Sequence, residues 1–325
     1  SNLRPTLFDL LAHVALQYYK DENNYITQPA YAFTINDSAA LGSAAIFMDA
    51  RFISKDSSSN LLLSLQLFQQ LMQFHARDND PAAFIDINLE RIEWVNEHGI
   101  FENKNTLYTK ALEDITTSFP NDKFTINAWY LLAKQYVDQA KLYTPFGDTS
   151  YRYDYLKAID IAGKQLEQKD ADSMGVLNMQ HLLFSIKEQQ LSTTVDSINV
   201  PDQHFRMLVK YRNITNINIR IINAAELKTI KMKRWEDGYW EAITAVPAIK
   251  TLWQALPATN DYQEHATEIK IDGLGAGSYC ILAAGSDRFD AQNDKLVVQS
   301  FDVSNISFIN NGADYFVLNR ETGAP

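Results

Sequence analysis

The spacing of apolar residues changes near residue 195, and this change constrains the fold more than any other feature of the sequence. Before it, apolar residues recur every three or four positions, as on one face of an α-helix. After it, they alternate with polar residues, as in a β-strand with one buried face. The 325 residues suffice for about two domains of ordinary size. We therefore expect an α-helical domain at residues 1–194 and a β domain at 195–304.

The first part is predicted to be an all-α bundle of repeat-like helix hairpins, because short connections make consecutive helices antiparallel neighbours. One pair resembles a tetratricopeptide repeat, although its connection is too long for a regular repeat. This resemblance rests on Trp129, Leu132, Ala133 and Tyr136, followed by Ala158 and Ala162. The stretch 22–58 mixes short apolar patches with polar linkers and is left unassigned. The periodic stretches are 7–18, 60–72, 81–99, 104–118, 124–142, 151–168 and 173–190.

The second part is predicted to be an antiparallel β-sandwich of immunoglobulin type, because its short strands are separated by Gly, Asn and Asp turns. The glycine-rich segment 273–278 superficially suggests a dinucleotide-binding loop. However, Ser278 stands where the third glycine belongs, and a strand follows where a helix would receive the phosphate. We interpret this segment as a turn between two strands. The predicted strands are 205–211, 217–221, 267–272, 279–284, 296–298 and 315–317.

Charge and composition exclude several classes of partner. The net charge is -11, with 29 Lys and Arg against 40 Asp and Glu, so we expect no nucleic acid and no anionic membrane surface. No apolar stretch has the roughly 20 residues of a membrane span. The single cysteine, Cys280, excludes an internal disulfide framework and a multi-cysteine metal site. Because it lies in an apolar run, we expect Cys280 to be a small buried hydrophobic residue.

No motif in the sequence points to catalysis, a metal or a cofactor. The six histidines show neither the i, i+4 spacing of a helical zinc site nor a His-Glu-x-x-His pattern. We expect them to be surface or capping residues. There is no Gly-x-Ser-x-Gly elbow and no phosphate-binding Walker loop. The acidic residues are interpreted as solvated helix faces. We therefore expect a non-catalytic protein without a cofactor or a metal.

Two aromatic clusters are the candidate ligand contacts. Rigid rings beside acidic residues can bind peptides or sugars at a low cost in conformational entropy. The alternative is that the rings fill space between helices or between the domains. The candidates are Tyr143, Phe146, Tyr151 and Tyr153 in the helical part, and Trp235, Tyr239 and Trp240 in the β part.

Residues 195–325 resemble bacterial alpha-2-macroglobulin-like proteins. The resemblance is carried by the stretch 256–271, by Leu274, Gly277 and Tyr279, and by the closing runs 303–307 and 315–325. The helical part resembles, loosely, the amino-terminal extension of some members. The resemblance implies that the β domain is an early macroglobulin-like domain, and that residues 305–325 begin a following β module. Pro325 would then be a boundary within a longer protein.

The family implies a function as well as a fold. Its members resemble protease traps, in which a protease cuts a bait segment. In many members a reactive thioester then captures the attacking protease. The resemblance implies an exported protein, periplasmic or on the outer surface, often anchored through a lipidated amino terminus whose leader is not in this sequence. Its partners would be further domains of the parent chain, with proteases as the targets. The thioester motif Cys-x-Glu-Gln is missing, because Cys280 is followed by Ile281, Leu282 and Ala283. No bait segment is recognisable.

Three functional hypotheses follow from the sequence. The first is a scaffold and interaction segment of an exported protease inhibitor. The second is a stand-alone helical-repeat binding module that recognises peptide or glycan through the aromatic loops. The third is an enzyme whose site is built from residues distant in sequence, which would require a deep pocket of carboxylates or histidines with perturbed pKa values.

Overall fold

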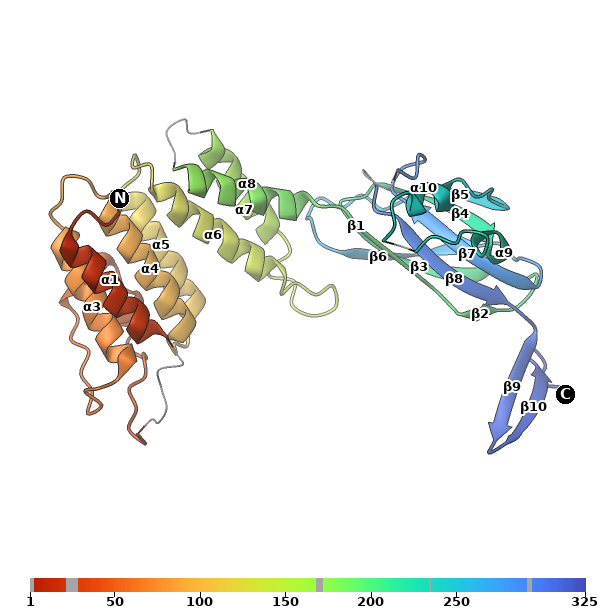
Figure 1. Cartoon of the computed structure of the whole chain (residues 1–325), viewed down its shortest axis with the longest axis horizontal. Coiled ribbons are helices and arrows are strands. Elements are labelled where there is room, and N and C mark those ends of the chain that lie inside the picture. Colours follow the sequence, from red (N-terminus) through yellow and green to blue (C-terminus); the bar gives the residue numbers. More distant parts are fainter. Residues whose placement is uncertain (1–2, 22–28, 168–171, 234, 291–293) are drawn as a thin grey trace. The chain divides into compact units, whose positions relative to one another are not determined.

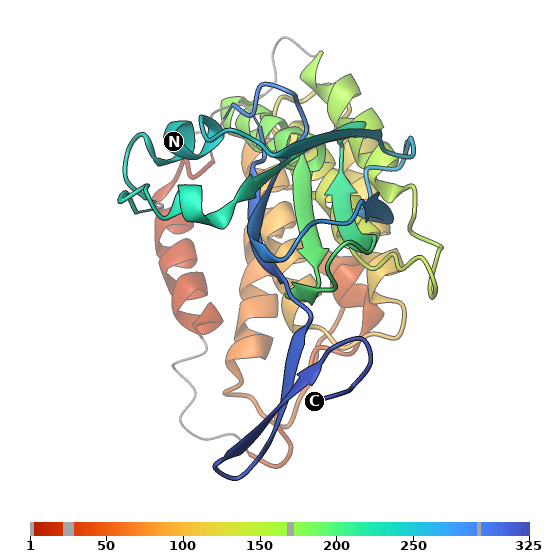
Figure 2. The same cartoon turned by 90° about the vertical axis from the view of Figure 1, so that its right-hand side faces the viewer.

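The computed structural model describes residues 3–21, 29–167, 172–233, 235–290 and 294–325, and it consists of two compact units (Figures 1 and 2). The helical unit ends at Ile186 and the β unit begins at Lys187. The first strand begins at Gln190, within the range 1–194 that was predicted to be the helical domain. That strand has a largely polar sequence, Gln-Leu-Ser-Thr-Thr-Val, in which only Val195 is buried, so the change in hydrophobic period becomes visible only after it.

The helical unit is a series of helices in which neighbours in the chain pack on one another. Contacts join α1 to α3, α3 to α4, α4 to α5, α5 to α6 and α6 to α7, and α4 also touches α6. The described helices are α1 (Leu7–Lys20), the 3-10 helix η2 (Ser38–Leu41), α2 (Ala44–Asp49), α3 (Asn60–His75), α4 (Ala82–His98), α5 (Lys104–Ser118), α6 (Thr125–Ala140), α7 (Asp154–Leu166) and α8 (Ser173–Lys187).

Local signals explain where several of these helices begin and end. Thr6 and Asp9 form a capping box at the start of α1, in which each side chain satisfies a backbone N–H of the other. The Ser59 hydroxyl accepts from the backbone N–H of Leu62 at the start of α3. Helix α4 stops at Gly99, as its sequence predicted. Of the unassigned stretch 22–58, residues 22–28 lie outside the described ranges, and the remainder contains η2 and α2.

The core of the helical unit comes from the inward stripes of α3, α4, α5 and α6. Fully buried members include Leu65, Phe68, Ile85, Ile92 and Leu112. A buried cation also joins η2 to α4: the Arg91 guanidinium donates to the Asn88 side chain and to the carbonyls of Ala40 and Gly42. Burial lowers the pKa of Arg91 to about 9. These four hydrogen bonds compensate much of the desolvation of the guanidinium.

The β unit contains a three-stranded sheet in the order β1-β3-β6, a five-stranded sheet in the order β2-β8-β7-β4-β5, and the separate pair β10-β9. The pairings are antiparallel except for the short parallel contact of β2 with β8. The strands are β1 (Gln190–Val195), β2 (Ile198–Asn199), β3 (Phe205–Arg212), β4 (Asn216–Asn223), β5 (Lys250–Ala255), β6 (His265–Ile271), β7 (Gly277–Ala284), β8 (Val297–Val303), β9 (Ile306–Asn311) and β10 (Asp314–Asn319).

Alternating side chains of the two larger sheets share one apolar core. Met207 and Val209 of β3 belong to the same buried cluster as Ile219 of β4 and Ile281 of β7. Two short helices, α9 (Ala224–Leu227) and α10 (Tyr239–Thr244), lie between β4 and β5 in the chain. Cys280 is fully buried, as predicted.

The glycine-rich segment is a turn between β6 and β7, as the sequence predicted. A side chain at Gly273 would come within 2.5 Å of the Asp202 backbone, so only glycine fits without displacement of the neighbouring chain. The backbone N–H of Asp202 donates to the Leu274 carbonyl at 2.9 Å, which holds the two segments together.

The expectation that the histidines are surface or capping residues is wrong for His13 and His75. Both are buried, and His75 lies between two carboxylates. Its Nε2 is 2.7 Å from Asp9 and its Nδ1 is 2.7 Å from Asp78. Since Asp9 lies 66 positions away in the chain, the sequence alone offered no sign of this pairing.

Candidate functional site

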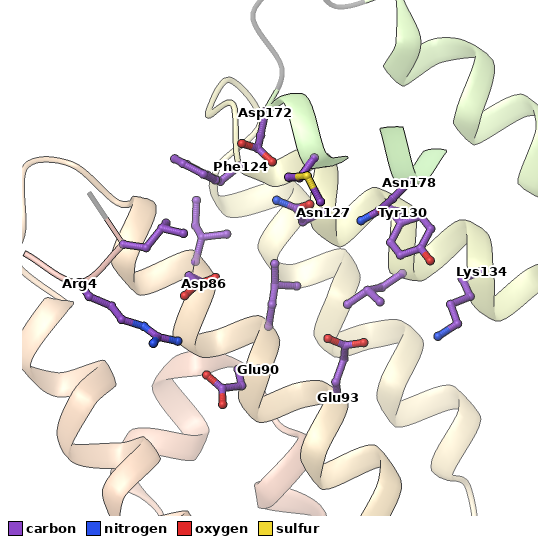
Figure 3. A pocket seen from close by; sticks show the side chains of 15 residues that line it. Arg4, Asp86, Glu90, Glu93, Phe124, Asn127, Tyr130, Lys134, Asp172 and Asn178 are labelled. Carbon is purple, nitrogen blue, oxygen red and sulfur yellow. The ribbon is translucent and has the colours of Figure 1, made fainter. Parts of the chain in front are cut away.

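A cavity of about 580 Å³ lies on the helical unit between α4, α6 and α8 (Figure 3). Its volume falls within the range of ordinary ligand sites. Apolar side chains of α4 and α6 form part of the wall, and charged and polar side chains form the remainder. The residues that line it are Leu3, Arg4, Ile85, Asp86, Leu89, Glu90, Glu93, Phe124, Asn127, Tyr130, Leu131, Lys134, Asp172, Met174 and Asn178.

Helix α4 contributes three carboxylates to one wall. Asp86, Glu90 and Glu93 are spaced by four and three residues, which places them on one face of the helix. Figure 3 shows Arg4 extending toward Asp86 and Glu90 from the side of the chain start. Like charges at i, i+4 repel one another, so this wall is electrostatically unfavourable unless a cation lies close to it.

The three carboxylates differ in how well they are compensated. Glu90 forms an ion pair with Lys20 at 2.7 Å, and the His13 Nε2 lies 4.0 Å from its other oxygen. Among the described residues, neither Asp86 nor Glu93 accepts a side-chain hydrogen bond or forms an ion pair. Burial, and next the charge of Glu90, raises the pKa of Asp86. Burial also raises the pKa of Glu93, although its side chain reaches solvent at the rim.

Helices α6 and α8 form the opposite wall. Asn127, Tyr130 and Lys134 are spaced by three and four residues along α6, and Figure 3 shows Lys134 across the cavity from Glu93. Helix α8 approaches α6 closely because Gly175 has no side chain. A Cβ at that position would lie 2.3 Å from the Ile126 side chain. The close approach of α8 to α6 brings Met174 and Asn178 into the lining.

The arrangement suits a ligand with a positive charge and an apolar part. The lining holds four carboxylates, those of Asp86, Glu90, Glu93 and Asp172, against the cations Arg4 and Lys134. A positively charged group beside Asp86 or Glu93 would relieve the repulsion that each experiences from Glu90, and it would supply the ion pair that neither forms among the described residues. The leucine and isoleucine side chains of the wall would contact the aliphatic part of such a ligand.

A second cavity, of about 370 Å³, lies against His75 and is lined by Ser43, Ser118, Asn88 and Asp114 among others. The two serines raise the question of nucleophilic catalysis, which needs a base within hydrogen-bond reach. Both ring nitrogens of His75 are occupied by carboxylates. The imidazole therefore has no nitrogen left to take a proton from either serine, and it serves to join α1 to the end of α3.

The aromatic residues selected from the sequence lie elsewhere. Tyr143, Phe146, Tyr151 and Tyr153 lie in or beside the loop from α6 to α7, whereas Trp235, Tyr239 and Trp240 lie at α10 of the other unit. Phe146, Tyr153 and Trp235 are exposed, and the other four are partly buried. None of the seven lines the cavity between α4, α6 and α8. Their role in binding remains a prediction.

Sequence reasoning missed the carboxylates of α4, which it interpreted as solvated surface. A signal was present in the acidic positions 86, 90, 93 and 97, which repeat on one helical face. The pattern did not reveal that α6 and α8 enclose this face. That enclosure depends on the packing at Gly175, which is a contact between helices separated in the chain.

Two further observations concern metals and membranes. Within the described ranges, no three His, Cys, Asp or Glu side chains gather closely enough to hold a metal ion. None of the helices in those ranges combines the length and the apolar character needed to cross a membrane.

No family model and no curated protein matches the chain. Among solved structures, one similar chain is a CARDB domain of a Pyrococcus furiosus protein in complex with di-metal ions. It shares 10% identity, with a TM-score of 0.22, over 36% of this chain and 92% of that one. Another is the PmoD soluble domain from a Methylocystis species, with 9% identity, a TM-score of 0.20, and coverage of 36% and 90%. At these TM-scores neither likeness bears on the fold or the function.

Proposed function

We propose that this chain is a non-catalytic scaffold and interaction segment of an exported bacterial alpha-2-macroglobulin-like protease inhibitor. In this proposal the β unit is a macroglobulin-like sandwich of immunoglobulin type and serves as one structural module in a series. The sequence resemblance over residues 195–325 supports it. A core shared by two mainly antiparallel sheets is compatible with such a sandwich. Proteases would be targets of the whole protein.

The observation that carries the proposal is the β9–β10 hairpin. Within the part of the chain that the structure describes, these two strands pair only with each other, and they form a separate ribbon beyond β8 (Figure 1). Large apolar side chains are between 55 and 64% exposed on both faces of the pair. They are Ile306, Phe308, Tyr315 and Val317 on one face, and Ile309 and Phe316 on the other. A hairpin of two strands is marginally stable in water, and apolar residues on both faces are typical of strands within a larger β module.

Hydrogen exchange tests this interpretation of the hairpin. We expect the amides of β9 and β10 to exchange much faster than those of β7, which pairs on both sides within the five-stranded sheet. Replacing Phe308 and Phe316 with serine should leave the melting temperature of the β unit unchanged. As a matched control, Phe301→Ser in the buried core should lower it. Protection of the hairpin equal to that of β7 would show a self-sufficient element, and the proposal would lose its main support.

The cavity of the helical unit favours a second function, the binding of a positively charged peptide segment. The specific observation is that Asp86 and Glu93 form no ion pair among the described residues, in a cavity with partly apolar walls where four carboxylates outnumber the two cations Arg4 and Lys134. This function belongs to the class of peptide-binding helical modules. It places the binding surface between helices and not on the aromatic loops.

Titration with fluorescent peptides tests the second function. We expect a lysine- and arginine-rich peptide to bind and its glutamate-rich counterpart not to bind, with an affinity that falls as salt is added. Asp86→Asn combined with Glu93→Gln should weaken binding by about 100-fold or more, since each of the two lost charge-assisted hydrogen bonds contributes about 1.5–3 kcal/mol. Glu97→Gln is the matched control, because Glu97 continues the acidic stripe without lining the cavity. Equal binding by all variants would exclude this site.

A further inference from the structure

Helix α1 is oriented with its apolar stripe toward solvent. Leu7, Leu10, Leu11, Val14 and Tyr18 are between 56 and 69% exposed. The opposite face, which the unit buries, carries Asp9, Ala12, His13 and Leu16. The sequence identified the exposed residues as a helical stripe, and such a stripe ordinarily faces the core. In α1 the apolar stripe faces solvent, and the buried face includes an aspartate and a histidine.

Specific polar contacts hold α1 in this orientation. The Asp9 carboxylate accepts from the backbone and the hydroxyl of Thr6, each at 2.8 Å, and lies 2.7 Å from the buried His75 Nε2. His13 Nδ1 lies 2.8 Å from the Asp9 carbonyl. At the other end of the helix, Lys20 pairs with Glu90. Turning α1 to bury its leucines would break these contacts, so the exposure of the stripe is built into the fold.

The exposed surface is large for a chain that acts alone. Phe8 and Phe74 extend the stripe, with ring centroids 4.8 Å apart and side chains 40 and 47% exposed. With about 180 Å² for each fully exposed large apolar side chain, the exposed part of the seven residues comes to roughly 700 Å². The largest apolar patch on a typical monomer is about 300–600 Å². One partner of a standard protein–protein interface contributes about 800 Å².

We propose that this patch is a homodimer interface, in which α1 packs antiparallel against α1 of a second copy. A two-fold contact uses the same patch on both copies, so the patch must be self-complementary. The stripe meets this condition, because its residues are spaced by three and four as in paired helices. From Leu7 to Tyr18 the exposed side of α1 carries no Lys, Arg, Asp or Glu. Two copies can therefore meet there without burying like charges, despite a net charge of -11 on each.

Sedimentation equilibrium of the whole chain tests the proposal. We expect the mass to rise with concentration from 37.0 kDa to twice that value, and the melting temperature to rise with it. Leu11→Glu should weaken association by at least about 30-fold, because a buried unpaired charge is strongly unfavourable. Phe184→Glu is the matched control, and this replacement should leave the mass unchanged. Phe184 is 72% exposed and belongs to α8, a helix drawn at the end of the helical unit opposite to α1 in Figure 1.

A crosslinking variant keeps the test decisive if Leu11→Glu does not fold. In the antiparallel arrangement, Leu11 lies near the middle of the helix and therefore near the two-fold axis. Leu11→Cys should form a disulfide between copies under mild oxidation, whereas Phe184→Cys should not. The native Cys280 is buried and would not interfere. A monomer at every concentration, or a dimer that neither Leu11→Glu nor Leu11→Cys affects, would overturn the proposal.

Discussion

Replacing His75 with alanine should destabilise the helical unit more than any single exposed substitution. The ring is buried between the buried carboxylate of Asp9 and that of Asp78, whose side chain is 40% exposed. Its removal leaves the Asp9 charge in the interior with only Thr6 as a hydrogen-bond partner among the described residues. Breaking a buried pair by removing one partner costs about 3–5 kcal/mol. For a unit of this size, that is a fall in melting temperature of roughly 6–20 °C.

Differential scanning calorimetry of the whole chain measures this effect. The matched control is His181→Ala, because His181 is exposed on α8. It should change the free energy of unfolding by less than about 0.5 kcal/mol. Asp78→Ala should have an intermediate effect, because solvent can replace its contact with His75. A fall of less than about 2 °C for His75→Ala would refute the reasoning that the buried contact between His75 and Asp9 fixes α1.

Three further predictions concern the helical unit. Asp86→Asn should raise the free energy of unfolding at pH 7 by at least roughly 0.2–0.5 kcal/mol, because it removes a charge that is disfavoured first by burial and next by repulsion from Glu90. Folding raises the pKa of Asp86 above 3.8, so the ionised carboxylate lowers the free energy of unfolding at pH values above the raised pKa. This destabilisation is lost as the pH falls through the raised pKa to 3.8 and below, so wild type and variant should converge in acid urea melts. Trp129→Ala should cost about 2–3 kcal/mol in chemical denaturation, because the ring packs against the core; an unchanged midpoint would contradict that packing. Replacing Tyr151 and Tyr153 together with alanine should leave the melting temperature nearly unchanged and remove any glycan or peptide binding that depends on these rings. Binding that persists would exclude them as the site.

The helices were largely predictable because their signals are local. The range 104–118 was predicted from periodicity alone and coincides with α5, and Gly99 ended α4 as expected. The strands were predictable where one face is buried, as in β3 and β4. β5 was missed because it is an edge strand with mostly exposed residues, so it lacks the alternation that marks a half-buried strand.

The functional surfaces were less predictable because they depend on contacts between distant residues. The stripe of α1 was visible, but its outward orientation depends on Asp9 meeting His75 from another helix. The acids of α4 were visible as well, but the cavity requires the approach of α8 at Gly175. In both cases the sequence identified the residues and not what they face. Periodicity defines a helix face, and only packing decides whether that face is core, groove or interface.

Sequencing the gene beyond the codon for Pro325 tests the proposed place of this chain in a protease inhibitor. The proposal predicts that the reading frame continues into further β modules, the first of which supplies strands that cover the β9–β10 hairpin. A Cys-x-Glu-Gln motif in that continuation would specify covalent capture of the protease. A stop codon within a few residues of Pro325 would contradict the proposal and would favour a self-contained binding protein.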